Sequence, residues 1–307
     1  MSKLSAAILR QQDDICSTIV IRLLAQRPPF AELARVEGER IVQRDREDEE
    51  KLALGIECAI RRGALPPRPA VSPTHKLNVV GLTSQQVMEK ILHVLPSREG
   101  NVITLEGLSG TGKGTTVSKL QQALPRCVAW SNGNVFRCYT HLCHEILSSQ
   151  QREVTAANLT PELLAAVEKR VTFVEAAPGK FETLLDRHRV SEIQNTLLKA
   201  PVVSQLVPTV AQATQGEVIR FGAAAVKKLS AAGYNVILEG RAQTLQYIAT
   251  NLRFELVIPD AAVLGQRRAA QLVMAKALEL IKPTMGTAAD AEVEATLQAA
   301  LELLSKK

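Results

Sequence analysis

The sequence predicts an α/β protein: a parallel, doubly wound sheet with helices on both faces, preceded by an α-helical appendage. The first observation behind this fold class is that, from residue 101 onward, short apolar runs alternate with amphipathic helical patterns. This order is typical of parallel sheets, whose strands need crossover helices. The second is that residues 1–75 contain helical patterns and end in a proline-rich linker at 64–73. The expected strands cover 102–106, 126–130, 236–239 and 254–258.

Two helices are expected before the linker, at residues 3–27 and 30–62, separated by Pro28 and Pro29. The second helix carries eleven charged residues among the fifteen from Glu37 to Lys51. A run of that density is usually a solvated helix face. We therefore treat residues 1–75 as a separate helical module whose role is docking, either onto the rest of the chain or onto a protein partner.

The remaining chain divides at residue 99. Residues 76–98 are expected to form a linker and a short helix at 83–95, which the Thr83-Ser84 pair would cap. Residues 99–307 form the α/β domain. Residues 150–232 separate the second and third strands, which is too long for a crossover, so this segment is expected to be an inserted helical lobe. The C-terminus is expected to be a linker and one amphipathic helix, 289–304.

A glycine-rich loop follows the first strand, with the sequence Gly-Leu-Ser-Gly-Thr-Gly-Lys-Gly-Thr at 107–115. Its glycines let the backbone approach a polyphosphate, and the helix that follows adds its positive end. The lysine can reach the β- and γ-phosphates, and a neighbouring hydroxyl can lie near Mg²⁺. The sequence therefore predicts an ATP site. Its residues are Gly107, Ser109, Gly110, Thr111, Gly112, Lys113, Gly114, Thr115 and Thr116.

Three further segments accompany the loop: 131–137 after the second strand, 203–220 in the expected lobe, and Leu238-Glu-Gly-Arg241 at the end of the third strand. In this order the motifs resemble those of cytidylate kinases, which are P-loop nucleoside monophosphate kinases. The resemblance covers roughly residues 100–270. It implies a P-loop kinase fold, ATP with Mg²⁺, and transfer of the γ-phosphoryl to CMP or dCMP. A hairpin-like stretch at 171–184 stands where that family carries strands in its monophosphate-binding lobe. The resemblance therefore also implies that the lobe binds the monophosphate.

The resemblance also implies roles for individual residues. Arg137, Arg220 and Arg241 match the arginines that bind the acceptor phosphate, and the arginine fork suits that task because it pairs two oxygens at once. Arg267 and Arg268 match a lid helix that closes over the transferring phosphoryl. Glu106 and Glu239 end adjacent strands, where either can hold Mg²⁺ through water or orient a loop. We assign Lys113, Arg267 and Arg268 to catalysis, Thr115 and Glu106 to the metal, and Glu239 to the acceptor site.

The chain departs from this family in ways that favour a second function. Ser131 and Ala242 stand where the family has Asp, and no arginine occurs after Arg268. One lid segment and one strand are therefore expected to be missing. Losing one positioned donor costs about 10²–10³ in rate. The alternative to an active kinase is a catalytically degenerate, kinase-like subunit of a larger assembly.

Composition excludes several classes of function. The net charge of +6 is too small, and the aromatic content of 3% too low, to indicate a nucleic-acid-binding protein. No apolar run is long enough to cross a bilayer. Five cysteines without a disulfide spacing indicate a reducing compartment, so we expect a cytoplasmic protein. A faintly amphipathic start and the docking helices leave an organelle or a host assembly open.

Overall fold

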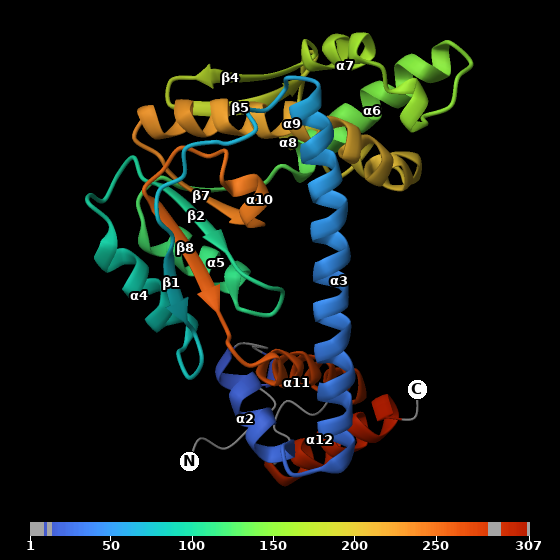
Figure 1. The fold of residues 1–307 in the computed structure, drawn as a ribbon. Coiled ribbons are helices and arrows are strands. Elements are labelled where there is room, and N and C mark those ends of the chain that lie inside the picture. The colour runs from blue at the N-terminus through green and yellow to red at the C-terminus, as the bar shows by residue number, and fades with distance from the viewer. Residues whose placement is uncertain (1–8, 11–13, 282–289, 306–307) are drawn as a thin grey trace.

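The computed structural model describes residues 9–10, 14–281 and 290–305. Its centre is a five-stranded parallel sheet in the order β1-β8-β2-β7-β3, which confirms the α/β class (Figure 1). Four strands lie where the apolar runs predict them. The strands are β1 (His75–Asn78), β2 (Val102–Glu106), β3 (Cys127–Trp130), β7 (Asn235–Gly240) and β8 (Leu252–Val257).

Helices cover both faces of this sheet. On one face, α4 (Ser84–Val94) and α5 (Lys113–Ala123) pack against side chains of β2 and β8 such as Leu105 and Phe254. On the other, α9 (Pro201–Ala231) and α10 (Ala242–Leu245) pack against β7 at Leu238. The expected cap of α4 is present as a capping box, in which Thr83 and Gln86 satisfy each other's backbone N–H groups.

The edge strand β1 corrects the expectation that residues 76–98 begin as a linker. It pairs with β8 in parallel from His75–Phe254 to Asn78–Val257. Its sequence, His-Lys-Leu-Asn, has a single strongly apolar residue, so it lacks the pattern that identified the other strands. An edge strand needs little apolar surface because one side is open. The fifth strand, expected to be missing after β8, is thus supplied from the N-terminal part of the chain.

The segment between β3 and β7 forms a lobe above the sheet in Figure 1. The hairpin expected at 171–184 is confirmed as β4 and β5, and a third antiparallel strand, β6, extends it. Buried side chains from α6, including Tyr139 and Leu142, form the core of this lobe with α9. The elements are α6 (Gly133–Ser149), α7 (Pro161–Glu168), β4 (Val171–Ala177), β5 (Lys180–Leu185), β6 (His188–Arg189) and α8 (Val190–Ile193).

The longest helix is α3 (Pro28–Arg61), and it connects the two ends of the molecule (Figure 1). Its 34 residues correspond to about 50 Å. At one end it packs against α11 (Ala261–Leu280), where a Cβ on Gly265 would lie 2.1 Å from the carbonyl oxygen of Ala34. At the other it packs against α9, where a Cβ on Gly216 would lie 2.7 Å from the Cβ of Ala59. The N-terminal helices therefore pack closely against the rest of the chain.

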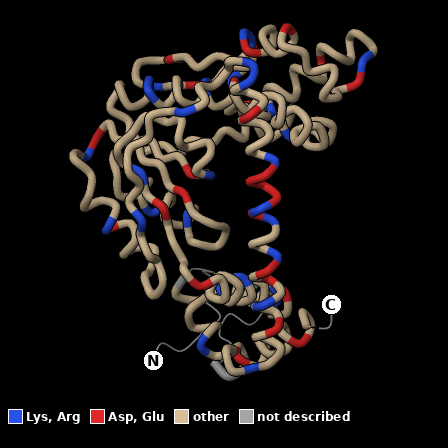
Figure 2. Tube along the Cα trace, in the orientation of Figure 1, with Lys and Arg blue, Asp and Glu red and all other residues tan. Residues whose placement is uncertain are grey.

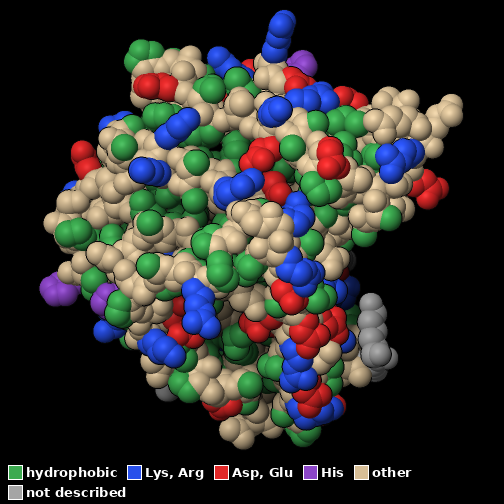
Figure 3. Space-filling model, turned by 45° about the horizontal axis from the view of Figure 1, so that its top comes forward, with side chains coloured by type: hydrophobic (Ala, Val, Ile, Leu, Met, Phe, Trp, Pro, Cys, Tyr) green, Lys and Arg blue, Asp and Glu red, His purple; other side chains and the backbone are tan. Residues whose placement is uncertain are grey.

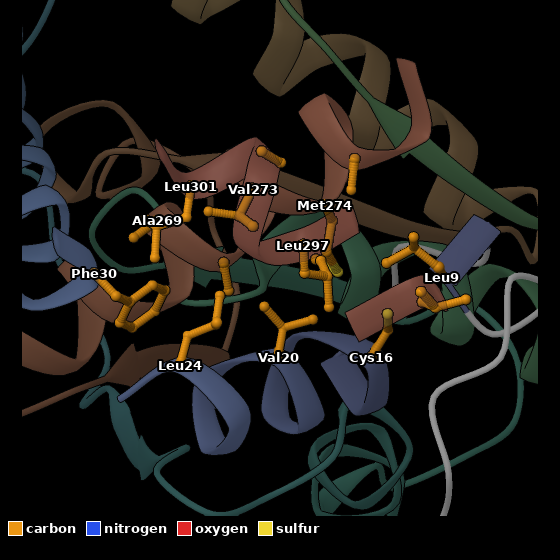
Figure 4. Close-up of a cluster of buried hydrophobic side chains, with 14 of the residues drawn as sticks. Leu9, Cys16, Val20, Leu24, Phe30, Ala269, Val273, Met274, Leu297 and Leu301 are labelled. Carbon is orange, nitrogen blue, oxygen red and sulfur yellow. The ribbon is translucent and has the colours of Figure 1, made fainter. Parts of the chain in front are cut away.

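A second core joins the two chain ends (Figure 4). On α2 (Asp14–Leu24), the side chains of Cys16, Val20 and Leu24 are buried at a spacing of four residues. They face α11 and α12 (Asp290–Ser305), which contribute Val273 and Leu297 among others. Helix α12 confirms the C-terminal helix of the sequence, while the preceding linker lies outside the described residues. Burying each such aliphatic side chain stabilises the fold by about 1.5–3 kcal/mol.

The charged run of α3 is partly buried, which corrects its interpretation as a solvated face. Charges of both signs follow one another along α3 in Figure 2, and many reach the surface in Figure 3. Glu37 and Asp45, however, are almost fully buried. The part of the chain that the structure describes contains no helix long and apolar enough to cross a membrane. All five cysteines are free, in agreement with their spacing.

Candidate functional site

The glycine-rich loop joins the end of β2 to the start of α5. Gly107, Gly110 and Gly112 have φ angles of 141°, 85° and 92°, in the region that favours glycine. Gly107 is also restricted by space, because a Cβ there would lie 2.5 Å from the carbonyl oxygen of Leu256. The loop therefore needs its glycines for shape. Because α5 begins directly after it, the unpaired N–H groups and positive end of that helix face the loop.

Lys113 is the first residue of α5 and folds back over the loop. Its Nζ donates hydrogen bonds to the carbonyl oxygens of Gly107 and Leu108, at 2.7 and 2.9 Å. Burial of the ammonium lowers its pKa, Arg241 lowers it further, and two nearby carboxylates oppose the change. A lysine held in this way places a compact positive charge beside the loop, which favours an anion there.

A cavity of about 730 Å³ opens beside the loop, which is in the size range of small-molecule sites. Its walls come from the loop and α5, from α2, from the turn after β1, from α11 and from the end of β7. The charged side chains in its walls are Arg22, Lys113, Arg267 and Glu239, so cations outnumber carboxylates. The loop contributes Ser109, Gly110, Gly112, Lys113, Gly114 and Thr115, while Thr111 and Thr116 are buried. This balance favours an anionic ligand.

Glu106 and Glu239 end adjacent strands but point to opposite faces of the sheet. In the register of β2 and β7, Glu239 pairs with Leu105, whereas Glu106 pairs with Gly240. Side chains alternate along a strand, so only Glu239 shares the face of Leu105. Burial, and then the neighbouring Glu255, raise the pKa of Glu106. The register thus separates Glu106 from Thr115, with which the sequence analysis pairs it as a metal ligand.

A second cavity, of about 300 Å³, adjoins the first at the carboxyl ends of β3 and β7. Glu239 lines both cavities. It is the one charged side chain among the described residues around the second cavity, whose other side chains are aromatic, aliphatic, amide or hydroxyl groups. Its polar and aromatic walls include Trp130, Ser131, Asn132, Phe136, Gln215 and Thr244. The two cavities therefore share one carboxylate, that of Glu239.

Asp45 of α3 links the loop to Arg241. Its carboxylate oxygens accept hydrogen bonds from the Ser109 backbone N–H at 2.8 Å, from Ser109 Oγ at 2.7 Å and from Arg241 Nη2 at 2.7 Å. The Asp45 side chain is only 3% exposed. Burial raises the pKa of this carboxyl, but the hydrogen bonds outweigh burial and lower it to about 2. The group is therefore a carboxylate at any ordinary pH.

The other two expected acceptor arginines have partners in the lobe. Arg137 Nη1 donates to the Leu198 carbonyl oxygen at 3.3 Å. Arg220 Nη2 lies 2.9 Å from a carboxylate oxygen of Glu168. None of the three arginines, Arg241 included, is among the described residues that line the two cavities. The structure therefore does not bring the three arginines together at one point.

The two arginines of α11 that were expected in a lid separate in a similar way. The cavity beside the loop is lined by Arg267, whose Nη2 donates to the Val79 carbonyl oxygen at 3.2 Å. Arg268 is turned toward α3, with its Nε 3.9 Å from Glu37. Neighbouring residues on a helix point about 100° apart, so the two side chains leave α11 in different directions. Of the expected catalytic residues, Lys113 and Arg267 therefore lie together and Arg268 does not lie with them.

The sequence analysis missed Asp45 and Arg22 as site residues. A signal for Asp45 exists: Ala34, Gly38, Ile41 and Asp45 follow one another at spacings of four, three and four. Such a stripe lies on one face of a helix, and a carboxylate on a buried stripe needs a specific partner. Arg22 gives no comparable signal, because its place in the cavity depends on how α2 packs.

A scan of the chain against protein-family models gives no match, and a search of the curated proteins finds no similar sequence. The candidate site is therefore defined by its own residues and geometry.

Proposed function

We propose that this protein is an ATP-dependent phosphotransferase of the nucleoside monophosphate kinase type, with CMP or dCMP as the acceptor. One observation carries the proposal. A strand, a glycine-rich loop and a helix N-terminus line a cavity with Lys113 and Arg267, and this cavity adjoins a second one through Glu239. Phosphoryl transfer needs this arrangement, because catalysis of that reaction consists mostly of positioning two substrates and neutralising phosphate charge.

In this proposal the triphosphate of ATP lies against the loop, with Lys113 at the β- and γ-phosphates and Arg267 beside the transferring group. The bond between the γ-phosphorus and the bridging oxygen breaks and leaves ADP. A new bond forms between that phosphorus and a phosphate oxygen of the acceptor. The acceptor occupies the smaller cavity, where Trp130 and Phe136 offer aromatic surface to a base.

The residues around the larger cavity also fit Mg²⁺. The hydroxyl of Thr115 and the carboxylate of Glu239 line the same cavity, and hard oxygen ligands of this kind, completed by water and phosphate, are what Mg²⁺ prefers. When bound, the ion would neutralise charge on the phosphates. The fit favours Glu239 over Glu106 as the carboxylate that would hold it.

The second candidate function is a kinase-like subunit that binds nucleotide without transferring phosphate. The observation that favours it is the engagement of the acceptor arginines by protein groups, in particular the pairing of Arg220 with Glu168. An acceptor phosphate would have to compete for such a side chain. This pair is partly exposed, however, and exposed ion pairs contribute little stability, so it can be exchanged for a phosphate.

A coupled ADP-release assay across CMP, dCMP, UMP and AMP distinguishes the two functions. We expect ADP release with CMP or dCMP, and its loss in Lys113→Ala. ATP binding, measured by thermal stabilisation, without ADP release for any acceptor would support the subunit function. Absence of ATP binding in the wild-type protein would refute both.

A further inference from the structure

Helix α3 is held rigidly on both sides of Asp45. On the α11 side the backbones of Gly38 and Gly265 touch, because a Cβ on Gly38 would lie 3.4 Å from the Gly265 Cα. On the α9 side, Ala59 meets Gly216, and Arg62 pairs with Glu217 at 2.9 Å just after the helix. A helix packed this closely at two separate places does not rotate or slide easily. The Asp45 carboxylate therefore has a fixed position.

That carboxylate connects two parts of the site that are far apart in sequence. One oxygen accepts from the Ser109 backbone N–H, and the other accepts from Ser109 Oγ and from Arg241 Nη2. Ser109 belongs to the loop, and Arg241 follows β7. Charged hydrogen bonds of this length are strong and directional. Asp45 thus fixes the distance between the loop and the Arg241 guanidinium.

Arg241 retains donors for a ligand. Among the described residues, its hydrogen bond is the one from Nη2 to Asp45. Two other carboxylates lie farther away: Asp48 is 3.8 Å from Nη2 and Glu49 is 4.0 Å from Nη1. A guanidinium has five N–H groups in a rigid plane, so one fixed contact orients all the others. The Arg241 side chain remains 21% exposed. The remaining N–H groups are available to an anion that enters from solvent.

We propose that Asp45 is a positioning residue for the acceptor phosphate: it acts through Arg241, whose free N–H groups it directs, and through Ser109, which it ties to the same point. This inference rests on the proposed function and deepens it, because it makes the N-terminal helix α3 part of the acceptor site. It also explains why a chain whose α/β domain resembles a kinase carries a helix across that domain.

An opposite role is conceivable for the same contact, in which the Asp45 carboxylate competes with a phosphate for Arg241. Displacing it would leave a buried carboxylate without its partner, which is costly, and would require α3 to move from two close helix contacts. The positioning role requires neither change. The two roles predict opposite effects of removing the charge, so one experiment distinguishes them.

The test is Asp45→Asn in the full-length protein, with Glu47→Gln as the matched control. Asn can still accept from the Ser109 N–H, but it presents an amide N–H to Arg241. Glu47 lies on the same helix, is exposed and bonds Gln43, so its substitution removes the same charge away from the site. Direct binding of CMP, binding of ATP and steady-state kinetics with both substrates are measured for each variant.

We expect Asp45→Asn to lower kcat/KM for CMP about 10- to 100-fold, mainly through weaker CMP binding, with ATP affinity changed by less than about 3-fold. Glu47→Gln should remain within about 2-fold of wild type. In an Arg241→Ala background, the effect of Asp45→Asn should disappear, because the two residues act as a pair. A merely structural role would give the same loss in both backgrounds.

Tighter CMP binding in Asp45→Asn would show that the carboxylate competes with phosphate, and unchanged binding would show that it does not position Arg241. Either result overturns the inference about Asp45. The proposed function would still be supported in that case if the kinase activity depends on Lys113. Should Asp45→Asn not fold, Asp45→Glu keeps the charge and moves the carboxylate by about 1.5 Å. Its CMP affinity should also fall, and wild-type affinity would overturn the inference. A wild-type protein that binds no CMP would overturn both proposals.

Discussion

Replacing Gly265 by Ala should separate α3 from α11 and destabilise the protein. The new Cβ would lie 2.1 Å from the Ala34 carbonyl oxygen and 3.1 Å from the Gly38 backbone nitrogen. Both neighbours are backbone atoms, so relief requires the helices to move apart by roughly 1 Å, and such overpacking costs about 1–3 kcal/mol. Alanine recovers up to about 1 kcal/mol of helix propensity. We therefore expect a net loss of about 1–2 kcal/mol.

The assay is urea unfolding followed by the fluorescence of Trp130, the only tryptophan of the chain. A loss of that size lowers the midpoint by about 0.5 M for a protein of this length. The matched control is Gly38→Ala on the facing helix, where the Cβ would make an ordinary contact at 3.4 Å with the Gly265 Cα. That variant should be as stable as wild type or more stable by up to about 1 kcal/mol. Equal stability of Gly265→Ala and Gly38→Ala would refute the described crossing of α3 and α11.

Three further predictions concern charged groups of the site. Lys113→Ala should abolish the thermal stabilisation by ATP, and an unchanged stabilisation would exclude the loop as the ATP site. Arg22→Ala should weaken ATP binding more than AMP binding because Arg22 lines the loop cavity. The control, Arg27→Ala, should leave the binding of both nucleotides unchanged. Titration calorimetry with ATP and with AMP measures the difference. Asp45, whose pKa falls from 3.8 to about 2 on folding, should stabilise the protein above pH 4 by about 2 kcal/mol. That contribution should be lost between about pH 4 and pH 2. Chemical unfolding should therefore show that the free energies of unfolding of wild type and Asp45→Asn converge at acid pH. A difference in unfolding free energy that stays constant with pH would contradict the prediction.

The candidate site was only partly predictable from sequence. The loop was recognisable because its glycines, lysine and threonine follow one another in the chain, and local order is what a motif records. Lys113 and Thr115 therefore lie where they were expected. Glu106 was predicted to be a metal ligand together with Thr115, but the sequence could not show that Glu106 and Glu239 lie on opposite faces of the sheet, because the strand register is set by pairing between strands far apart in sequence.

The N-terminal segment shows a second limit of sequence interpretation. Its dense charges indicated a solvated face, and the general tendency holds for most of them. Asp45 is an exception because its buried position is balanced by two partners, Ser109 and Arg241, that come from distant parts of the chain. Likewise, β1 was not recognised because a sheet edge places few demands on its own sequence.

By itself, the sequence determined the elements: apolar runs identified four strands of the sheet, and helix periodicity and caps identified most helices. The glycine-rich loop was found in its predicted place between a strand and a helix, and an anion site there stays a prediction. These features depend on residues close together in the chain. Only the tertiary structure decided that β1 completes the sheet, that Glu239 faces both cavities, and that α3 crosses the domain with Asp45 between the loop and Arg241. Each of these depends on contacts between distant segments, where strand register and helix packing decide which side chains meet.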